Sequence, residues 1–412
     1  MAAEASSQKV NSRAARAASA DWIAEQQAVW GRNADELRFA LLAWYAEHGR
    51  RLPWRESRDA YRIWLSEIML QQTTVAAVIP YFERFTELYP TVRDLAAASV
   101  DDVLRLWEGL GYYSRARNLH RTALRIVAEY NGEFPADLFE LQQLPGVGRY
   151  TAGAIASFAF DIPAPIVEAN TQRLYARLMA LEDDIRTTAA VKQLWAFAES
   201  IVSRDRPADF NQAVMDLGAR VCTVADPDCH SCPLAVHCVA YREQLQDELP
   251  RRGAVQQITP VNELTVVIRR GDKVLVRLRG NAERWTAMWD FPRLEVTDQQ
   301  LAEVPRGVQR TGRGKVVAAS LFTADQEPLG DELAEQIQQQ CGLLPGVPEE
   351  SLQRSYSVTR YRVQMLAIAC PVSGRLQRSL PNGYCWKSLQ ELTELPMPRT
   401  GRQIVEWLHR RA

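Results

Sequence analysis

The sequence lacks long apolar runs, and this absence limits the classes of protein that it can encode. No stretch of the 412 residues reaches the ~18 uninterrupted apolar residues that a membrane span requires. The first twenty residues, MAAEASSQKVNSRAARAASA, also lack the apolar centre of a secretory signal. We therefore expect no membrane partner, a reducing compartment, and a disordered tail over residues 1–20. Organelle targeting is the alternative for this tail, because it is rich in Ala, Ser and Arg.

The sequence also lacks an excess of charge of either sign. Its 49 Lys and Arg residues balance 50 Asp and Glu residues, so the formal net charge is -1 and any contact with a polyanion must be local. One local candidate is YYSRARNLHRTALRIV, in which basic residues occur without an acid before Glu129. They are Arg115, Arg117, His120, Arg121 and Arg125. Taken alone, such a run is more often a solvated helix face.

Two regions of the chain differ in hydrophobic period, which predicts two domains. Apolar residues recur at the helical period in DELRFALLAWYAEH, DAYRIWLSEIML and VDDVLRLWEGL, so residues 21–240 are expected to be all α. The polar segment 241–260 has the composition of an interdomain linker. In residues 261–412, ELTVVIRRGDKVLVRLRG predicts a strand hairpin around Gly271, YRVQMLAIACPV a strand, and ADQEPLGDELAEQIQQQCG a helix. This second domain is therefore expected to be α+β.

Four of the seven cysteines lie in one short segment, CTVADPDCHSCPLAVHC. Their spacing is Cys-x6-Cys-x2-Cys-x5-Cys, and they are Cys222, Cys229, Cys232 and Cys238. Without a secretory signal, a metal centre is favoured over a disulfide framework. Zinc accepts four thiolates, but zinc ribbons usually pair two Cys-x2-Cys knuckles and this segment has one. An all-cysteine iron-sulfur cluster fits the spacing better.

A glycine pair indicates a site for phosphate. In LPGVGRYTAGAIASFAF, Gly146 and Gly148 come directly before an apolar, small-residue helix. The amides at a helix N-terminus attract anions, although an ordinary tight turn is the alternative. A predicted helix, LFELQQL, precedes the glycines, which gives helix, hairpin, helix. A dinucleotide-binding motif is excluded, because no strand precedes them and no third glycine follows.

Two further segments carry residues suited to distorted DNA. MLQQT offers Leu70, Gln71 and Gln72 at a helix end, and GLGYY offers Tyr112 and Tyr113 beside the basic run. Flipping a base out of a duplex leaves a gap, and an amide or aromatic side chain that enters it lowers the cost. Individually, such residues are more often core or helix-cap residues.

Taken together in order and spacing, several segments closely resemble the adenine DNA glycosylases of the MutY family, within the helix-hairpin-helix glycosylase superfamily. The segments are LPWRESRDAYRIWLSEIMLQQTTV, IPYFERF, LWEGLGYYSRARNLH, LPGVGRYTAGAI, FNQAVMDLGARVC and the four-cysteine loop. The resemblance is strong over residues 35–240 and looser beyond them. It implies an all-α helix-hairpin-helix glycosylase domain with an iron-sulfur loop, followed by an α+β Nudix-like domain that recognises the oxidised base.

The resemblance also implies roles for individual residues. Glu67 matches the acid that protonates the departing adenine, and Tyr150 stands where lyase relatives have a Schiff-base lysine. A catalytic role is implied for Asn170 beside Glu168, and Cys222, Cys229, Cys232 and Cys238 match the ligands of a [4Fe-4S] cluster. The residues expected to contact DNA, adenine or the lesion are Trp54, Arg55, Leu70, Gln72, Tyr112, Gly146, Gly148, Gln212, Thr359 and Arg360.

The chain departs from the family in both domains. Where the family usually reads Asp-Gly-Asn-Val, this chain reads Glu168, Ala169, Asn170 and Thr171, so the second catalytic carboxylate is a Glu. In the second domain, Val358-Thr359-Arg360 replaces the usual Phe-Ser-His of the lesion-sensing loop. The segment QQLAEVPRGVQRTGRG lacks the paired Glu residues of a Nudix hydrolase, so nucleotide hydrolysis is not expected.

Breaking an N-glycosidic bond requires a proton on the leaving base and negative charge near the developing cationic sugar. Glu67 has the apolar neighbours Trp64, Leu65, Ile68 and Met69, which predict a raised pKa and a carboxyl group that stays protonated near neutral pH.

Glu168 must stay ionised, and we expect the polar neighbours Asn170 and Tyr150 to help. It keeps the charge of an Asp but adds one methylene, and a misplacement of about 1 Å costs on the order of 100-fold in rate.

The expected function is therefore that of a monofunctional glycosylase of base excision repair. It would act as a monomer on double-stranded DNA and release adenine paired with 8-oxoguanine or guanine. Alternatives are a non-catalytic or attenuated protein that binds the mispair, because of Glu168, and a glycosylase for another mispaired base. The expected location is the bacterial cytoplasm, in association with the nucleoid, or otherwise a nucleus or organelle.

Overall fold

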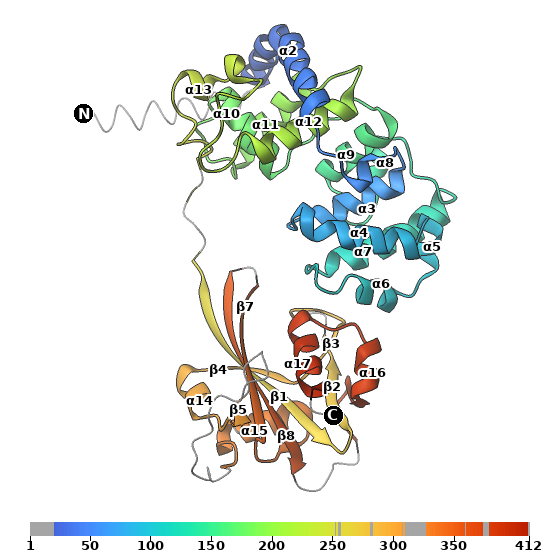
Figure 1. Ribbon diagram of the computed structural model, residues 1–412, viewed down its shortest axis with the longest axis vertical. Coiled ribbons are helices and arrows are strands. Elements are labelled where there is room, and N and C mark those ends of the chain that lie inside the picture. Colours follow the sequence, from blue (N-terminus) through green and yellow to red (C-terminus); the bar gives the residue numbers. More distant parts are fainter. Residues whose placement is uncertain are drawn as a thin grey trace, which may run out of the picture. The chain divides into compact units, whose positions relative to one another are not determined.

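The computed structural model of the chain divides into two compact units (Figure 1). The first consists of Met1–Ala98 and Ser114–Val255, and the second of Ser99–Tyr113 and Gln256–Ala412. The division after Val255 falls inside the segment that the sequence predicts to be a linker. The structure describes residues 20–251, 253, 257–280, 283–306, 308–309, 327–358, 360–373 and 379–410, with side chains of residues 20–33 and 308–309 excepted. Most of the predicted N-terminal tail lies outside these residues.

Within the described residues, the first unit is built from helices, as predicted. The early helices are α2 (Ala20–His48), η1 (Pro53–Arg55), α3 (Ala60–Leu70), α4 (Val75–Leu88), α5 (Val92–Ala97) and α7 (Ser114–Glu129). The later ones are α8 (Leu138–Gln143), α9 (Arg149–Phe160), α10 (Ala169–Met179), α11 (Thr188–Ile201), α12 (Pro207–Arg220), η2 (Ala235–His237) and α13 (Val239–Arg242). No described helix is both long enough and apolar enough to cross a membrane.

Helices α3 and α9 pack against each other in this unit, and both are largely buried. Asp59 caps α3 by accepting hydrogen bonds from the backbone amides of its first turn, which fixes where the helix begins. Small residues along α9 allow close approach: a Cβ on Gly153 would lie 2.5 Å from the carbonyl oxygen of Pro165. The extended segment before α10 therefore packs directly on α9, and this packing places Glu168 at the start of α10.

Part of the predicted linker is packed against the first unit. Leu249 is 2% exposed, and its carbonyl oxygen accepts a hydrogen bond from Arg177 Nε at 2.9 Å. The sequence suggested a linker here because the segment is polar. Its one buried apolar side chain and a buried arginine from α10 nevertheless hold it to the helices.

The second unit is a mixed sheet with helices, which confirms the predicted α+β class. Its sheet order is β3-β2-β1-β8-β7-β5 among the described residues, with β4 on β1, β6 on β8 and β9 on β2. The strands are β1 (Thr259–Arg270), β2 (Lys273–Leu278), β3 (Trp289–Asp290), β4 (Arg293–Val296), β5 (Val308–Gln309), β6 (Leu344–Pro345), β7 (Glu350–Val358), β8 (Tyr361–Ser373) and β9 (Tyr384–Ser388). The predicted hairpin is β1–β2, which turns at Gly271 with a positive φ of 61°.

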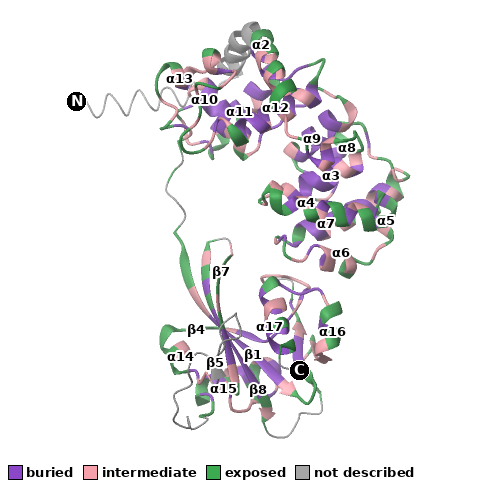
Figure 2. Cartoon of the chain, viewed as in Figure 1, coloured by how far each residue is buried: buried purple, intermediate pink, exposed green. Residues whose placement is uncertain are grey.

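Helices cover both faces of the central strands of this sheet. The helices of this unit are α6 (Val100–Leu106), α14 (Asp298–Glu303), α15 (Asp331–Cys341), α16 (Leu389–Glu394) and α17 (Arg399–His409). Of these, α15 covers one face of the sheet, and α16 and α17 cover the other. Leu264, Val266 and Ile268 of β1 pack with α15, whereas Val267 packs with α16 and α17. Successive side chains of a strand point to opposite faces, so both faces of β1 carry core residues, and its six central residues, 263–268, are buried while its ends are exposed (Figure 2).

One charged network is buried in this second core. Arg293 is 7% exposed and donates to Glu263 Oε1 at 2.6 Å, Asp290 Oδ1 at 2.9 Å and Thr400 Oγ1 at 2.9 Å. A second guanidinium, Arg279, donates to Asp290 Oδ2 at 2.8 Å. Each carboxylate is thus paired with a cation, as buried charges must be.

Replacing Arg293 by Met should therefore destabilise the second unit by about 3–5 kcal/mol, because it leaves two carboxylates buried without their main partner. The measurement is the free energy of unfolding of the full chain, followed by a signal from the sheet. Both Arg293 and Arg284 lie over the Trp285 ring, 5.2 and 6.0 Å from its centre. Arg284 is less buried, so Arg284→Met should cost less than about 1 kcal/mol. Equal losses in the two variants would contradict the role given to the buried network.

Candidate active site

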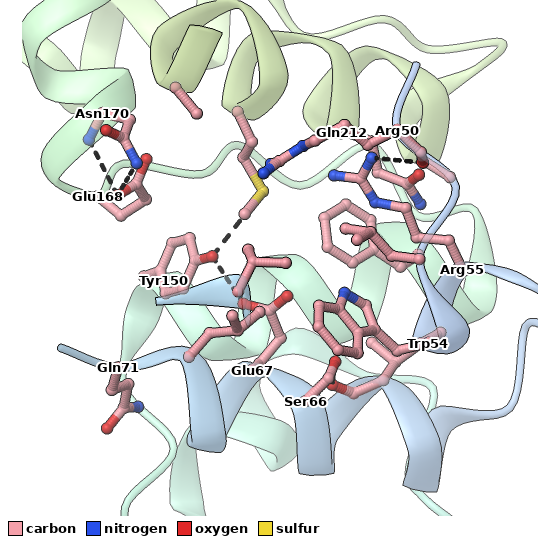
Figure 3. A pocket seen from close by; sticks show the side chains of 18 of the residues that line it. Arg50, Trp54, Arg55, Ser66, Glu67, Gln71, Tyr150, Glu168, Asn170 and Gln212 are labelled. Atoms are coloured by element: carbon pink, nitrogen blue, oxygen red, sulfur yellow. Dashed lines mark hydrogen bonds between the residues drawn. The ribbon is translucent and has the colours of Figure 1, made fainter. Parts of the chain in front are cut away.

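A cavity of about 830 Å³ in the first unit gathers most of the predicted site residues (Figure 3). Its walls come from η1, α3, α9, α10 and α12. The predicted residues that line it are Trp54, Arg55, Glu67, Leu70, Gln72, Tyr150, Glu168, Asn170 and Gln212. Its volume lies in the range of small-molecule sites and accommodates a single nucleobase.

Glu67 forms the acidic centre of the cavity. Its carboxyl group is on α3 and is 3% exposed, and Tyr150 Oη on α9 donates to Glu67 Oε2 at 2.6 Å. Burial raises the pKa of Glu67 to about 7, although the Tyr150 hydrogen bond and the charge of Arg55 act in the opposite direction. The raised pKa that its apolar neighbours predicted is therefore present.

An acidic residue that sequence reasoning missed organises the arginine side of the cavity. Asp216 of α12 is fully buried, and it accepts two hydrogen bonds from the Arg55 guanidinium, at 2.9 and 3.0 Å. Arg50 donates to the same carboxylate through its backbone amide and its Nε. Burial acts to raise the pKa of Asp216, but the hydrogen bonds and charges of Arg55 and Arg50 together lower it.

One signal could have revealed Asp216. It lies four residues after Gln212 within FNQAVMDLGARVC, and residues four apart share one face of a helix. Gln212 itself accepts a hydrogen bond from Tyr45 at 2.5 Å, so its amide has a fixed orientation. Trp54 is held by an edge contact with Phe82, whose ring centre lies 5.4 Å away. These partners come from distant parts of the sequence, and local patterns do not show them.

Glu168 lies at the first turn of α10, where its carboxylate acts as the N-cap. Its Oε2 accepts from the Asn170 backbone amide at 2.9 Å and from Asn170 Nδ2 at 3.4 Å. Its Oε1 accepts from the Thr171 backbone amide at 3.0 Å. Asn170 therefore supports the Glu168 carboxylate, as expected, with both its backbone amide and its side-chain amide.

The expectation that Tyr150 also supports Glu168 is not matched by the hydrogen bonds. The phenol of Tyr150 donates to Glu67, which leaves Glu168 to the helix amides. Burial raises the pKa of Glu168 above its ordinary value, and the hydrogen bonds from Asn170 and Thr171 only partly offset this. Glu168 is therefore harder to ionise than an exposed glutamate, though amide donors favour its charged form.

The end of α3 carries the Leu70–Gln72 turn into the cavity wall. Gln72 has a positive φ of 58°, which is unusual for a residue other than glycine. Arg115 of α7 holds this turn: its Nη1 donates to the carbonyl oxygens of Ile68, Met69 and Gln71 at 2.6–2.9 Å. The first arginine of the basic run is therefore buried and structural, whereas the sequence suggested either a solvated face or a polyanion contact.

The glycine pair forms the predicted hairpin between α8 and α9. Gly146 has a positive φ of 77°, and a Cβ there would lie 2.8 Å from Asn118 Cβ, so only glycine fits. Gly148 is the N-cap of α9, and a Cβ there would meet no atom within 4 Å. Neither glycine lines the cavity.

The remaining predicted residues belong to the second unit. Tyr112 is 45% exposed and has a positive φ of 49°. Arg360 is exposed and donates to Tyr361 Oη at 3.0 Å. Thr359 lies outside the described residues.

The four clustered cysteines surround one small cavity between α10 and the loop after α12. Arg177 Nη1 donates to Cys222 Sγ at 3.3 Å, and Cys238 Sγ lies 3.5 Å from the Arg177 carbonyl oxygen. Within the described part of the chain, no three acidic, histidine or cysteine side chains converge on a point that a single ion would occupy. A space bounded by four sulfurs fits a multi-atom cluster, in which each thiolate binds a different iron.

The burial of Glu67 gives a prediction about stability. In the folded chain its pKa is about 7, against an ordinary value of 4.5, so the unfolded chain releases this proton first as pH rises. Stability is therefore lost between about pH 4.5 and pH 7, by about 3 kcal/mol in total. Gln does not titrate, so the Glu67→Gln protein does not lose this stability. Its free energy of unfolding relative to wild type should therefore rise by about 2–3 kcal/mol between about pH 5 and about pH 8.

The measurement is the free energy of unfolding of both proteins at the two pH values. The matched control is Glu87→Gln on the exposed side of α4, which should change stability by less than about 0.5 kcal/mol at either pH. A Glu67→Gln effect that is independent of pH would mean that the carboxyl group is not held neutral by burial.

Comparison with known proteins identifies relatives of this chain. The model of the HhH-GPD superfamily base excision DNA repair proteins matches residues 65–199. The chain is 45% identical over 235 residues to a human adenine DNA glycosylase, and this match covers 55% of the chain and 43% of that protein. It is 37% identical over 256 residues to an adenine DNA glycosylase of Buchnera aphidicola (subspecies Schizaphis graminum), covering 62% of the chain and 74% of that protein.

Among solved structures, a thermostable thymine-DNA glycosylase is 28% identical, with a TM-score of 0.46, and the match covers 52% of the chain and 98% of that structure. The chain spans less than half the length of the human relative. It spans about three quarters of the Buchnera protein. On this identity and coverage, the chain belongs to the adenine DNA glycosylases of the MutY family.

Proposed function

We propose that the protein is a monofunctional DNA glycosylase that hydrolyses the N-glycosidic bond of adenine paired with 8-oxoguanine or guanine. The observation that carries this proposal is the pair of carboxyl groups in one cavity of nucleobase size. Glu67 is buried and accepts a hydrogen bond from the Tyr150 phenol, whereas Glu168 is held by backbone amides. Different environments suit the two groups to opposite roles, one as acid and one as anion.

Glu67 acts as the general acid. With a pKa of about 7 it carries its proton in a large fraction of molecules near neutral pH, and it can give that proton to the departing adenine. Tyr150 Oη fixes the orientation of the carboxyl group. Arg55, paired with Asp216, lies with Trp54 and Gln212 on the side of the cavity away from Tyr150 and Glu168 (Figure 3).

Glu168 acts as the anion that stabilises the cationic sugar while the bond to the base breaks. The amides at the N-terminus of α10 hold its carboxylate and favour its charged form. Water then adds to the sugar as the final nucleophile. Because a tyrosine stands at position 150, this part of the cavity offers no amine for a Schiff base, which supports hydrolysis without strand cleavage.

The substrate is double-stranded DNA, bound by the protein as a monomer. The hairpin at Gly146 and Gly148 presents the N-terminus of α9, which suits a phosphate of the backbone. Gln72, held in a rare backbone conformation at the cavity wall, suits the gap left by the flipped base. Tyr112 and Arg360 of the second unit are candidates for contacts with DNA and with the oxidised base.

Cys222, Cys229, Cys232 and Cys238 would hold a [4Fe-4S] cluster. Such a cluster supplies a rigid, thiolate-bound centre that cross-links the loop after α12. The chain's own contribution is the guanidinium of Arg177, which donates to one ligand sulfur and to the Thr223 carbonyl oxygen. For location, we propose the bacterial cytoplasm in association with the nucleoid, or a nucleus or organelle in a eukaryotic source.

Single-turnover release of adenine from an A:8-oxoguanine duplex tests the function. Wild type should release adenine, and Glu67→Gln and Glu168→Gln should each slow release by at least about 100-fold, because each lacks a group that acts only in the transition state. The rate should fall on the alkaline side through about pH 7 as Glu67 ionises, and on the acid side as Glu168 becomes protonated.

Tight binding of the mispair without release by wild type would overturn the proposal in favour of a mispair-binding protein. Release of a different base would assign another substrate.

The cluster has its own test. Purified protein should show a broad absorbance near ~400 nm and contain about four irons per chain. Cys238→Ser should lower both, whereas Cys385→Ser, in the second unit and outside the cysteine cavity, should change neither. Iron content that is unaffected by Cys238→Ser would contradict the assignment.

A further inference from the structure

Glu168 is an unusual residue for the N-cap of a helix. N-caps are normally Asn, Asp, Ser or Thr, whose short side chains reach the amides of the first turn without much rotational freedom. Glu168 has one more rotatable bond, yet its two oxygens accept separately from the Asn170 and Thr171 amides, at 2.9 and 3.0 Å. A longer side chain can hold such a position only if its backbone is also fixed.

Thr171 fixes that backbone through its hydroxyl group. The backbone amide of Glu168 donates to Thr171 Oγ1 at 2.8 Å, and Oγ1 donates to the Glu168 carbonyl oxygen at 3.1 Å. One hydroxyl therefore binds both backbone polar groups of residue 168, while the Thr171 amide binds its carboxylate. Thr171 is fully buried and does not line the cavity, so it can act on the reaction only through Glu168.

The first turn of α10 is also confined on the side of α12. A Cβ on Gly218 would lie 3.0 Å from both the Cβ and the carbonyl oxygen of Asn170, so the two helices are already in contact there. Arg173 additionally donates to Asn170 Oδ1 at 3.0 Å. The turn cannot shift toward α12. Asn170 and Thr171 bind the Glu168 carboxylate, and the Thr171 hydroxyl is the acceptor of the Glu168 amide.

We propose that Thr171 is a positioning residue for the Glu168 carboxylate. Its hydroxyl allows a glutamate at position 168 to hold its charge where the cationic sugar develops. This inference rests on the proposed function and extends it, since it assigns what holds Glu168 in place. Without the hydroxyl, the Glu168 amide loses this acceptor, whereas the Glu168 carbonyl oxygen keeps the hydrogen bond from the Gln172 amide at 2.7 Å. Displacements of about 1 Å at a reacting group cost on the order of 100-fold in rate.

The test is a double-mutant cycle on the full chain, with Thr171→Val placed in the Glu168 protein and in the Glu168→Asp protein. Single-turnover adenine release, its pH profile and affinity for the duplex are measured for each. In the Glu168 protein, Thr171→Val should slow release about 10-fold and leave affinity unchanged. The acid limb of the pH–rate profile should move to higher pH in this variant, because the Glu168 carboxylate loses well-placed amide donors.

In the Glu168→Asp protein, the same change should cost less than about 2-fold, because an aspartate reaches the helix amides by itself. Thr171→Ser keeps the hydroxyl and should stay within about 2-fold of wild type. The matched control is Thr91→Val, which removes a capping-box hydroxyl at α5, outside the cavity. It should lower stability and leave the rate and its pH profile unchanged.

Equal effects of Thr171→Val in both backgrounds, or a normal rate with an unmoved acid limb, would overturn the inference. Failure of the proposed function gives a different pattern: wild type releases no adenine, or Glu168→Gln is as fast as wild type. In that case, crystal structures of wild type and Thr171→Val still test whether Thr171 positions the Glu168 carboxylate. The inference requires the Glu168 carboxylate to leave the two amides in the variant, and an unmoved carboxylate would refute it.

Discussion

The burial of one carboxyl group, Glu67, is the constraint on which the active cavity depends. In the proposed mechanism Glu67 is the general acid, which must keep its proton until the base departs, and its burial raises the pKa to about 7. A cation close by would undo the effect. Arg55 is such a cation, and Asp216 binds its guanidinium through two hydrogen bonds, so much of its charge is compensated within the wall of the cavity. The buried Asp216 therefore protects the protonation state of Glu67 as well as the position of Arg55.

The two carboxyl groups are distinguished by their donors more than by their burial. Burial raises the pKa of both, but Glu67 accepts one hydrogen bond from a phenol, whereas Glu168 accepts from two backbone amides and a side-chain amide. Backbone amides at a helix N-terminus are fixed dipoles that cannot turn away, so they favour the anion throughout the reaction. The fold supplies this difference by placing one group inside α3 and the other at the start of α10.

Much of this arrangement could be predicted from the sequence, and the limits have a common physical origin. Helical period indicated the helices of the first unit, and the apolar neighbours of Glu67 indicated its raised pKa. The bonds of Asp216 to Arg50 and Arg55 join residues more than 160 positions apart, and no local pattern encodes them. Tyr150 was expected to support Glu168, but the packing of α9 on α3 directs its phenol to Glu67.

The glutamate at position 168 illustrates why a single residue does not define a catalytic group. Where a carboxylate lies depends both on the length of its side chain and on the position of its backbone, and here the Thr171 hydroxyl binds the amide and the carbonyl oxygen of residue 168. An extra methylene therefore need not displace the charge, provided that the first turn of the helix is held differently. Residues 168 and 171 are joined by three kinds of contact: the Thr171 amide binds the Glu168 carboxylate, and the Thr171 hydroxyl binds the amide and the carbonyl oxygen of Glu168. Effects of substitutions at the two positions are therefore expected to be non-additive. Whether residue 168 is Asp or Glu therefore predicts the position of its carboxylate only together with the residue at position 171.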